Sequence, residues 1–183
     1  MEINAERVIE LAKSVRPLFM DHERASRITV KGAADFVTQV DFLVQERMRS
    51  GLFDMYPQVQ FMGEEKDNRD IDFSGAVWIL DPVDGTTNLI HDFRCSALSL
   101  ALCDRGQMEL GLIYQPYEDE LFLAQRGKGA FLNGNPIHVS SVKDLGQSLI
   151  SIGTSPYNHD LADRNFEDIK RVFLKCSDIR RTG

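Results

Sequence analysis

Trp-Ile-Leu-Asp-Pro-Val-Asp-Gly-Thr-Thr-Asn occupies residues 78–88 and decides how the rest of the chain is interpreted. The apolar run that leads into it, residues 76–80, is typical of a buried strand. We expect this strand to break at Pro82 and a helix to begin in the Gly-Thr-Thr segment that follows. Two carboxylates, Asp81 and Asp84, would then lie together at a strand-to-helix turn.

Carboxylates held together repel each other unless one is protonated or a cation lies between them. An all-oxygen pair suits a hard ion such as Mg²⁺ better than it suits zinc. The backbone N–H groups of Gly85, Thr86 and Thr87 would point to the same place, and the start of a helix attracts phosphate. Residues 78–88 therefore predict a site at which a metal ion and a phosphate group bind next to each other. The alternative is an ordinary turn, because Asp, Pro and Gly are common turn residues.

Residues 81–88, Asp-Pro-Val-Asp-Gly-Thr-Thr-Asn, resemble the Asp-Pro-hydrophobic-Asp-Gly-Thr-Thr-Asn signature of the inositol monophosphatase family. This family belongs to the Mg-dependent, lithium-sensitive phosphatases, and an eight-residue match to its signature is highly specific. The resemblance implies an α+β fold, a layered α/β sandwich in which helices cover an antiparallel sheet. It favours the functional interpretation of the carboxylates over an ordinary turn.

Composition limits the classes of protein that the chain can represent. With 43% hydrophobic and 27% charged residues among 183, it is typical of a soluble globular protein. The net charge of -7 argues against a nucleic-acid surface but leaves a phosphate ligand open, since bound cations can reverse the local charge. No apolar run is long enough for a bilayer and the first residues lack a basic start, so we expect a cytoplasmic protein. The three cysteines are too scattered for a disulfide framework or a zinc site.

Two helices are expected in the first third of the chain. Asn4 can cap the first one, and Pro17 should bend or end it. The second follows Thr38 and has Gly51 near its end. Their apolar faces are formed by Val8, Leu11, Val15 and Leu18 in the first helix, and by Val40, Leu43, Val44 and Met48 in the second.

Asp41 has two competing interpretations. Thr38-Gln39-Val40-Asp41 is typical of a capping box, which by itself would explain both Thr38 and Asp41. Residues 35–41, preceded by Lys31-Gly32, also resemble the family's Asp-x-Val-Thr-x-x-Asp element, whose last aspartate helps a threonine of the main motif to activate water. We adopt the second interpretation, because two family motifs occur in the right order.

A short strand at residues 59–62 leads into Gly63-Glu64-Glu65. Adjacent glutamates are usually solvated surface residues, but these resemble the family's Gly-Glu-Glu metal element, in which the first glutamate, here Glu64, binds a cation. Glu65 is the weaker candidate, because adjacent side chains diverge in extended backbone. The charged stretch from Lys66 to Gly75 is expected to form a mobile surface loop near the site.

Beyond the central motif the pattern predicts a sheet. Strand-like segments at residues 95–103, 108–114 and 121–124 are joined by short turns, which indicates an antiparallel meander that the early helices can cover. Asn133-Gly134 is a strong hairpin turn, and Gly127-Lys128-Gly129 is better explained as a bend than as a phosphate loop. His91 we interpret as a capping or packing residue.

We divide the chain into residues 1–140, a metal- and phosphate-binding domain, and residues 141–183, the incomplete start of a second α/β domain. The second part has a strand at 149–153 and a helical stripe of Phe166, Ile169, Val172, Phe173 and Cys176. The resemblance covers about the first two-thirds of the family pattern. The remainder would carry an aspartate next to a tryptophan, so we expect the 183-residue chain to be weakly active or inactive.

The resemblance also implies a set of site residues. Asp81 would bridge two Mg²⁺ ions, Glu64 and the carbonyl of Val83 would bind one of them, and Asp84 the other. Thr86, supported by Asp41, would orient and deprotonate the attacking water. The catalytic residues are then Asp41, Glu64 and Thr86, the metal ligands Glu64, Asp81, Val83 and Asp84, and the substrate-binding residues Glu64, Val83, Asp84, Gly85 and Thr86.

The implied activity is Mg²⁺-dependent hydrolysis of small phosphate monoesters such as inositol monophosphate, by a homodimer with no direct nucleic-acid or membrane partner. Two alternatives stay open. One is a noncatalytic metal-binding or assembly module similar to extragenic suppressor proteins. The other lies within the enzyme class, as a bisphosphate nucleotidase or a fructose-bisphosphatase, because these share the metal motif.

Overall fold

The computed structural model describes residues 3–32, 35–64, 67–154, 156 and 158–181. The chain forms two compact units. Unit 1 comprises Met1–Thr29 and Val37–Ile137, and unit 2 comprises Val30–Phe36 and His138–Gly183. Within the described residues, no helix combines the length and apolar character that a membrane crossing requires.

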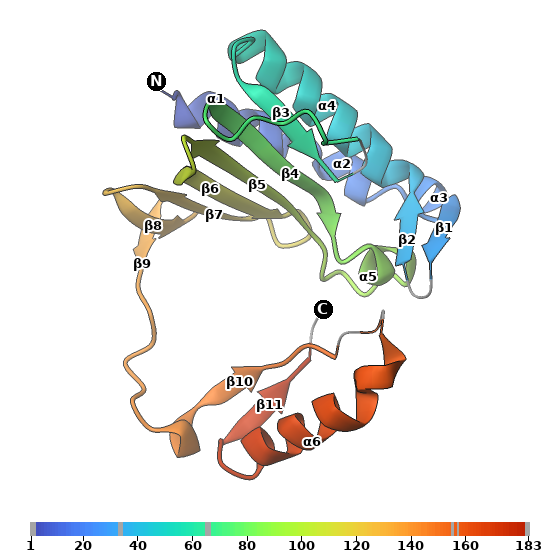
Figure 1. The fold of residues 1–183 in the computed structure, drawn as a ribbon, viewed down its shortest axis with the longest axis vertical. Coiled ribbons are helices and arrows are strands. Elements are labelled where there is room, and N and C mark those ends of the chain that lie inside the picture. Colours follow the sequence, from blue (N-terminus) through green and yellow to red (C-terminus); the bar gives the residue numbers. More distant parts are fainter. Residues whose placement is uncertain (1–2, 33–34, 65–66, 155, 157, 182–183) are drawn as a thin grey trace. The chain divides into compact units, whose positions relative to one another are not determined.

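Unit 1 is built on a sheet of seven strands in the order β3-β4-β5-β6-β7-β8-β9 (Figure 1). Strands β3 and β4 run parallel, and every following pair is antiparallel. The predicted meander is therefore confirmed as the centre of a larger sheet. The strands are β3 (Gln60–Gly63), β4 (Ala76–Asp84), β5 (Ala97–Asp104), β6 (Gln107–Gln115), β7 (Glu120–Gln125), β8 (Gly129–Leu132) and β9 (Asn135–Ile137).

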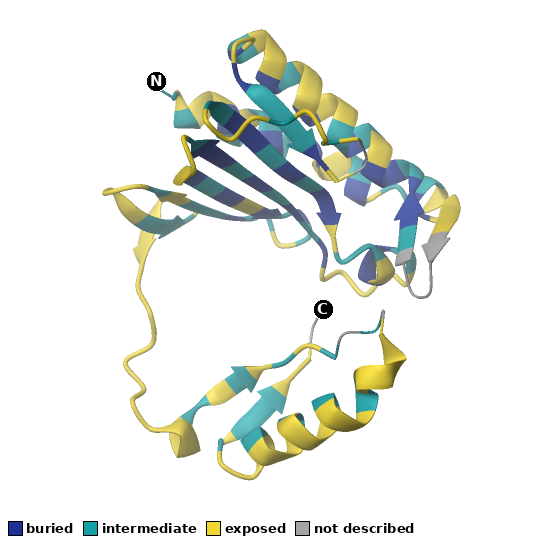
Figure 2. Cartoon of the chain, viewed as in Figure 1, coloured by how far each residue is buried: buried dark blue, intermediate teal, exposed yellow. Residues whose placement is uncertain are grey.

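Helices cover one face of this sheet (Figure 1). They are α1 (Ala5–Lys13), α2 (Arg16–Phe19), α3 (His22–Ala25) and α4 (Gln39–Met55), and a short helix α5 (Thr86–Ile90) follows β4. The core lies between α1, α4 and the central strands, whose buried positions are dark blue in Figure 2. Leu98, Leu100 and Leu102 alternate along β5 as a half-buried strand requires, and Trp78 of β4 packs against Tyr56 with ring centroids 5.8 Å apart.

One of the expected helix boundaries was wrong. Helix α1 ends at Lys13, and Pro17 lies in the first turn of α2, where the missing N–H of proline costs no hydrogen bond. Gly51 lies near the end of α4, as expected, since the helix ends at Met55. A Cβ atom at Gly51 would lie 2.5 Å from Cδ1 of Leu11, so this glycine allows α1 to approach α4 closely. The predicted cap is confirmed, since Asn4 accepts a hydrogen bond from the Arg7 amide.

A small ladder, absent from the sequence analysis, precedes α4. Strands β1 (Ile28–Gly32) and β2 (Asp35–Thr38) form a two-stranded sheet, and β2 ends at the residue that caps α4. Thr38 thus enters α4 from extended backbone, with φ -113° and ψ 171°, as a helix N-cap requires.

Unit 2 contains a strand-helix-strand arrangement. Strands β10 (Leu149–Ser151) and β11 (Asp178–Arg180) pair in parallel on either side of α6 (Ala162–Phe173) in the sequence, with short 3₁₀ turns at Leu145–Gln147 and His159–Leu161. The predicted helix is confirmed, although Cys176 lies beyond its end. Strand β11 had no counterpart in the sequence analysis. Phe166 and Phe173 of α6 are 59% and 49% exposed.

Candidate active site at the end of strand β4

Strand β4 carries the two aspartates of the central motif at its end. The expected break at Pro82 was wrong, because the strand continues to Asp84 through an irregularity in its pairing. Asp81 pairs with Ser99 and Asp84 with Ala97, so three steps along β4 correspond to two along β5. One extra residue makes a bulge, which accommodates a proline within a strand and redirects neighbouring side chains.

Gly85 turns the chain from β4 into α5, as expected. Its φ is +86°, a left-handed conformation that side chains with a Cβ rarely adopt, and an added Cβ would lie 3.0 Å from the Cys95 carbonyl oxygen. Two buried side chains hold this turn: Ser96 Oγ donates to the Gly85 carbonyl at 2.9 Å, and Asn88 Nδ2 donates to the Cys95 carbonyl at 2.7 Å. Neither side chain has a role that the sequence predicts. Only the position of Asn88 at the end of the motif marked it.

Glu64 reaches the same place from the neighbouring strand. Strands β3 and β4 are parallel with Gly63 opposite Leu80, and the Glu64 amide donates to the Leu80 carbonyl at 3.2 Å. Residues just beyond the two carboxyl ends therefore lie side by side. The Glu64 and Asp81 carboxyl groups share a hydrogen bond.

The electrostatics of Asp81 reflect this crowding. Burial, followed by the negative charges of Glu64 and Asp84, raises the pKa of Asp81 to about 7. The hydrogen bond from the Val83 amide to Asp81 Oδ1, at 3.1 Å, opposes the shift.

Glu64, Asp81 and Asp84 lie near one another, but they do not form a ready-made metal-binding geometry. Among the described residues, no three His, Cys, Asp or Glu side chains lie in a geometry that would hold an ion. Glu64 and Asp84 are exposed, whereas Asp81 is partly buried. These all-oxygen donors fit a hard divalent cation, which would relieve their mutual repulsion. Glu65 and Lys66 lie outside the described residues.

Asp41 and Thr86 are 45 residues apart in the sequence, but their side chains are in contact. Thr86 Oγ1 lies 3.2 Å from Asp41 Oδ1 and 3.0 Å from the Val83 carbonyl oxygen, so the hydroxyl proton faces two acceptors. Asp41 is 2% exposed, and this burial raises its pKa, while hydrogen bonds from Thr38 and Thr86 act in the opposite direction. The predicted capping box is also present, so Asp41 makes both of the contacts that the sequence analysis treated as alternatives.

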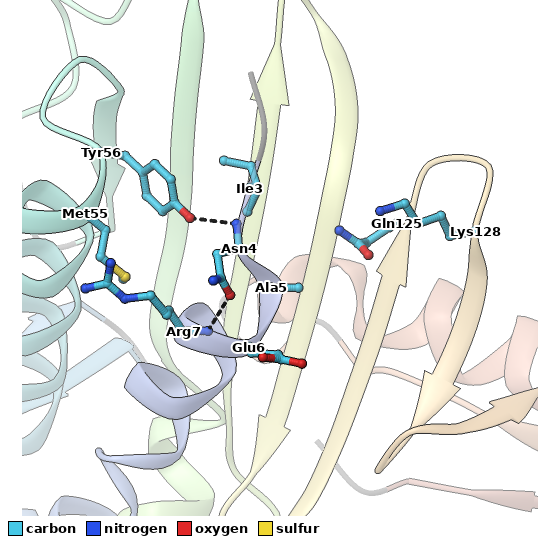
Figure 3. Close-up of a pocket in the computed structure, with 9 residues that line it drawn as sticks. All are labelled: Ile3, Asn4, Ala5, Glu6, Arg7, Met55, Tyr56, Gln125 and Lys128. Atoms are coloured by element: carbon cyan, nitrogen blue, oxygen red, sulfur yellow. Dashed lines mark hydrogen bonds between the residues drawn. The ribbon is translucent and has the colours of Figure 1, made fainter.

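A separate cavity of about 620 Å³ lies at the other end of α4 (Figure 3). Its lining includes Arg7, Tyr56 and Lys128, and the Tyr56 hydroxyl accepts a hydrogen bond from the Asn4 amide at 2.9 Å. Met55 in this cavity is 14 residues from Asp41, or roughly 20 Å along the helix. No predicted site residue lines it, so the candidate site stays at the end of β4.

Comparisons with known proteins agree with this geometry. A family model described as the inositol monophosphatase family matches residues 2–183. An inositol monophosphatase from Dictyostelium discoideum is 37% identical over 163 residues, which cover 87% of this chain and 59% of that protein. A protein named Nus factor SuhB from Vibrio cholerae is 38% identical over 164 residues, covering 88% of this chain and 61% of that protein.

A solved structure of an extragenic suppressor protein from Bartonella henselae superposes with a TM-score of 0.87 at 30% identity, over 98% of this chain and 70% of that one. The chain thus spans about three-fifths of the length of these two curated relatives. The family match over nearly every residue, together with the shared fold, establishes that the chain belongs to the inositol monophosphatase family.

Proposed function

We propose that the protein hydrolyses small phosphate monoesters, with inositol monophosphate as the representative substrate, in a reaction that depends on Mg²⁺. The observation that carries this proposal is the contact between Thr86 and Asp41 beside the carboxylate group of Glu64, Asp81 and Asp84. A hydroxyl linked to a buried carboxylate can position and deprotonate water, and the acidic group can hold a cation next to it.

The acidic residues divide into two kinds of donor. Asp81, whose pKa is raised by burial and by the charges of Glu64 and Asp84, would hold the cation together with those two carboxylates. The Val83 carbonyl is a further oxygen donor within the bulge of β4. When bound, Mg²⁺ supplies Lewis-acid activation of water and of the phosphate, and it stabilises charge on the leaving oxygen.

Thr86 and Asp41 supply the proton-handling groups. Thr86 Oγ1 would accept a hydrogen bond from water and donate its own proton towards Asp41 Oδ1, 3.2 Å away. Asp41 would hold the proton that leaves the water, because its remaining oxygen is already engaged by Thr38. The backbone at Gly85 and Thr86 would contact the phosphate, since the first amides of a helix are free to donate.

The test is phosphate release from inositol 1-phosphate with Mg²⁺ and after exhaustive chelation, for the full-length protein and its Asp84→Asn variant, since the 183-residue chain alone is expected to be weakly active or inactive. We expect turnover only with Mg²⁺, and a large loss in Asp84→Asn. Asp54→Asn, at an exposed position near the end of α4, is the control and should keep full activity. Undiminished turnover after chelation would overturn the mechanism.

A noncatalytic assembly module is the second candidate, because the Vibrio cholerae relative is named a Nus factor. Such a module would bind Mg²⁺ in calorimetry yet release no phosphate from inositol monophosphate, a bisphosphate nucleotide or fructose bisphosphate. Release from one of the last two alone would keep the proposed chemistry and change the substrate.

We further propose that residues 1–140 form the metal- and phosphate-binding domain and that the protein is a homodimer. Limited proteolysis followed by mass spectrometry tests the boundary, and light scattering of the purified protein tests the dimer. A cut between residues 137 and 149, where the chain has no strand or α-helix, would agree with the first proposal. A monomer at all concentrations would contradict the second.

A further inference from the structure

Thr38 lies behind the candidate catalytic pair and is 1% exposed. Its backbone amide donates to Asp41 Oδ2 at 2.8 Å, and its hydroxyl lies 2.6 Å from the same oxygen. Both contacts therefore fall on Oδ2. The other oxygen, Oδ1, is the one that faces Thr86.

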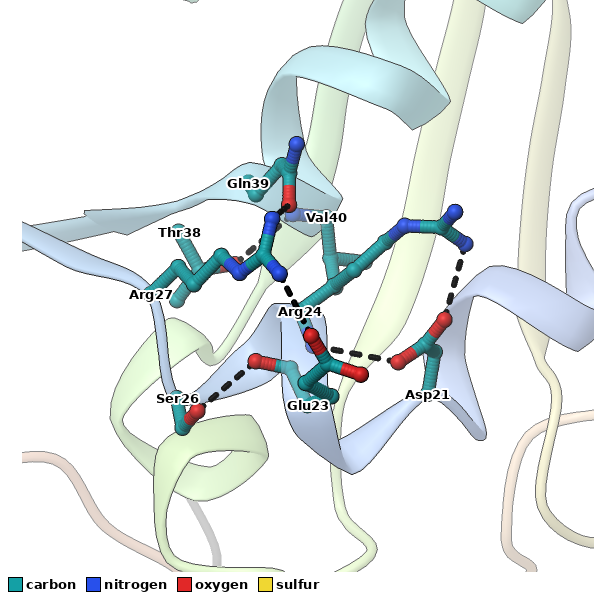
Figure 4. Close-up of polar contacts among 8 residues, drawn as sticks. All are labelled: Asp21, Glu23, Arg24, Ser26, Arg27, Thr38, Gln39 and Val40. Carbon is teal, nitrogen blue, oxygen red and sulfur yellow. Dashed lines mark hydrogen bonds and ion pairs between the residues drawn. The ribbon is translucent and has the colours of Figure 1, made fainter.

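The direction of the Thr38 hydroxyl follows from a third contact. The Val40 amide donates to Thr38 Oγ1 at 3.1 Å, as the dashed line between these residues shows in Figure 4. Because the amide can only donate, the hydroxyl oxygen accepts there, and its single proton is left for Asp41 Oδ2. Thr38 therefore donates two hydrogen bonds to Asp41, one from its amide and one from its hydroxyl, and its hydroxyl accepts none from Asp41.

A capping box does not by itself require this arrangement. Its role is to satisfy free N–H groups at the start of a helix, which water can also do at a surface. Here the carboxylate is 2% exposed, and burying a charged group is unfavourable unless hydrogen bonds compensate. Removing the Thr38 hydroxyl would leave Oδ2 with one donor fewer in a place that water reaches poorly.

We propose that Thr38 is a positioning residue for the reaction, which acts through Asp41 by fixing Oδ2 and so aiming Oδ1 at Thr86. The inference rests on the proposed function, because it needs Asp41 to receive the proton from the water-activating threonine. It gives one residue two separable tasks, capping α4 and orienting the base.

The start of α4 has other supports that do not use this hydroxyl. The Gln39 amide donates to the Arg27 carbonyl at 3.2 Å, and Arg27 Nη1 donates to Gln39 Oε1 at 3.0 Å. Arg27 also forms an ion pair with Glu23 of α3 (Figure 4). These contacts hold the first turn of α4 against α3, so we expect a variant without the hydroxyl to fold.

The experiment compares Thr38→Val, Thr38→Ser, Asp41→Asn and the double variant Thr38→Val/Asp41→Asn, with kcat, KM and melting temperature measured for each at saturating Mg²⁺. Valine keeps the shape of threonine, and serine keeps the hydroxyl. We expect kcat to fall at least ~10-fold in Thr38→Val with KM within about 2-fold, and Thr38→Ser to stay within about 3-fold of wild type.

The double variant distinguishes positioning from capping. If Thr38 acts through Asp41, adding Thr38→Val to Asp41→Asn costs no further kcat, whereas the melting temperature still drops. If Thr38→Val folds poorly, Thr38→Gly takes its place, since glycine is a tolerated N-cap without a hydroxyl.

The outcomes separate the two proposals. An Asp41→Asn protein with undiminished kcat would overturn the proposed mechanism itself. Loss of kcat in Asp41→Asn together with full kcat in Thr38→Val would overturn only the inference about Thr38. An equal loss from Thr38→Val in both backgrounds would also overturn it, because the threonine would then act only as a helix cap.

Discussion

Two acidic regions of unit 1, the start of α4 and the end of β4, differ in the groups that surround their aspartates. Asp41 at the start of α4 is surrounded by donors: the Thr38 amide, the Thr38 hydroxyl and the Thr86 hydroxyl. Asp81 at the end of β4 is surrounded by carboxylates, Glu64 and Asp84, and receives one backbone amide. Burial raises the pKa of both aspartates.

The difference shows what each region can do without a ligand. Burial raises the pKa of Asp41, and the hydrogen bonds from Thr38 and Thr86 oppose this shift, so its partners are in place in the protein alone. Like charges destabilise the ionised form of Asp81, so this region is complete only with a proton or a cation. The donors around Asp41 are in place without a ligand. The carboxylates at the end of β4 instead need a proton or a cation to offset their repulsion.

Removal of the metal should produce the largest effect. If the end of β4 depends on a cation, chelation should lower the rate of inositol monophosphate hydrolysis at least ~10³-fold, because several kcal/mol of transition-state stabilisation would be lost. Stopped assays of phosphate release before and after readdition of Mg²⁺ provide the measurement. Activity that survives chelation would remove the distinction between the two regions.

Substitution at the contact between the regions should come next. Thr86→Ala removes the hydroxyl that joins Asp41 to the bulge of β4, and we expect a loss of ~10²-fold in kcat with Mg²⁺ affinity preserved. Thr87→Ala, an exposed neighbour on the same short helix, is the matched control. A Thr86→Ala enzyme that keeps most of its turnover when metal-saturated would refute the assigned role.

The stability of the metal-free protein should depend on pH through Asp81. With a folded pKa of about 7 against an ordinary value of 3.8, Asp81 keeps its proton when folded but loses it when unfolded across this window. The free energy of unfolding therefore falls as pH rises from about 4 to about 7. We expect a lower melting temperature at about pH 8 than at about pH 5, and a smaller difference in Asp81→Asn.

Mg²⁺ sharpens this prediction, since it should raise the melting temperature at about pH 8 in the wild type more than in Asp81→Asn. Asp119 and Asp178 have lowered pKa values, so they make the free energy of unfolding rise with pH. The test is therefore the difference between the wild-type and Asp81→Asn curves, and not the wild-type curve alone. Identical curves for the two proteins would show that Asp81 is not the group that titrates.

The smallest expected effect concerns the support of the Gly85 turn. Ser96→Ala removes a buried hydrogen bond to the Gly85 carbonyl, and we expect a loss of about 1 kcal/mol in the free energy of unfolding. Chemical denaturation of the metal-free protein measures it, with Ser99→Ala, at the third residue of β5, as the control. A Ser96→Ala protein that is as stable as the wild type would show that the turn needs no side-chain support.

Much of the fold could be predicted because its signals are local. Asn4 caps α1, Thr38 caps α4, and the Asn133-Gly134 turn, with φ values of +48° and +82°, lies between β8 and β9. The error at Pro82 has a long-range cause. Pro82 was expected to end the strand, but pairing with β5 continues past it through a bulge. Gly51 lies near the end of α4, as expected, but the sequence did not show that it also allows the contact between α1 and α4.

The sequence by itself determined the family signature at residues 81–88, the identity of the acidic residues and the local geometry that delivers them, because turns, caps and strand patterns depend on neighbouring residues. Only the tertiary structure decided that Thr86 lies 3.2 Å from an aspartate 45 residues earlier, that Asp41 is buried with two Thr38 donors, and that Asp81 is crowded by Glu64. Distances and pKa values of this kind depend on how β3, β4 and α4 pack together, and packing brings together residues that no sequence window contains.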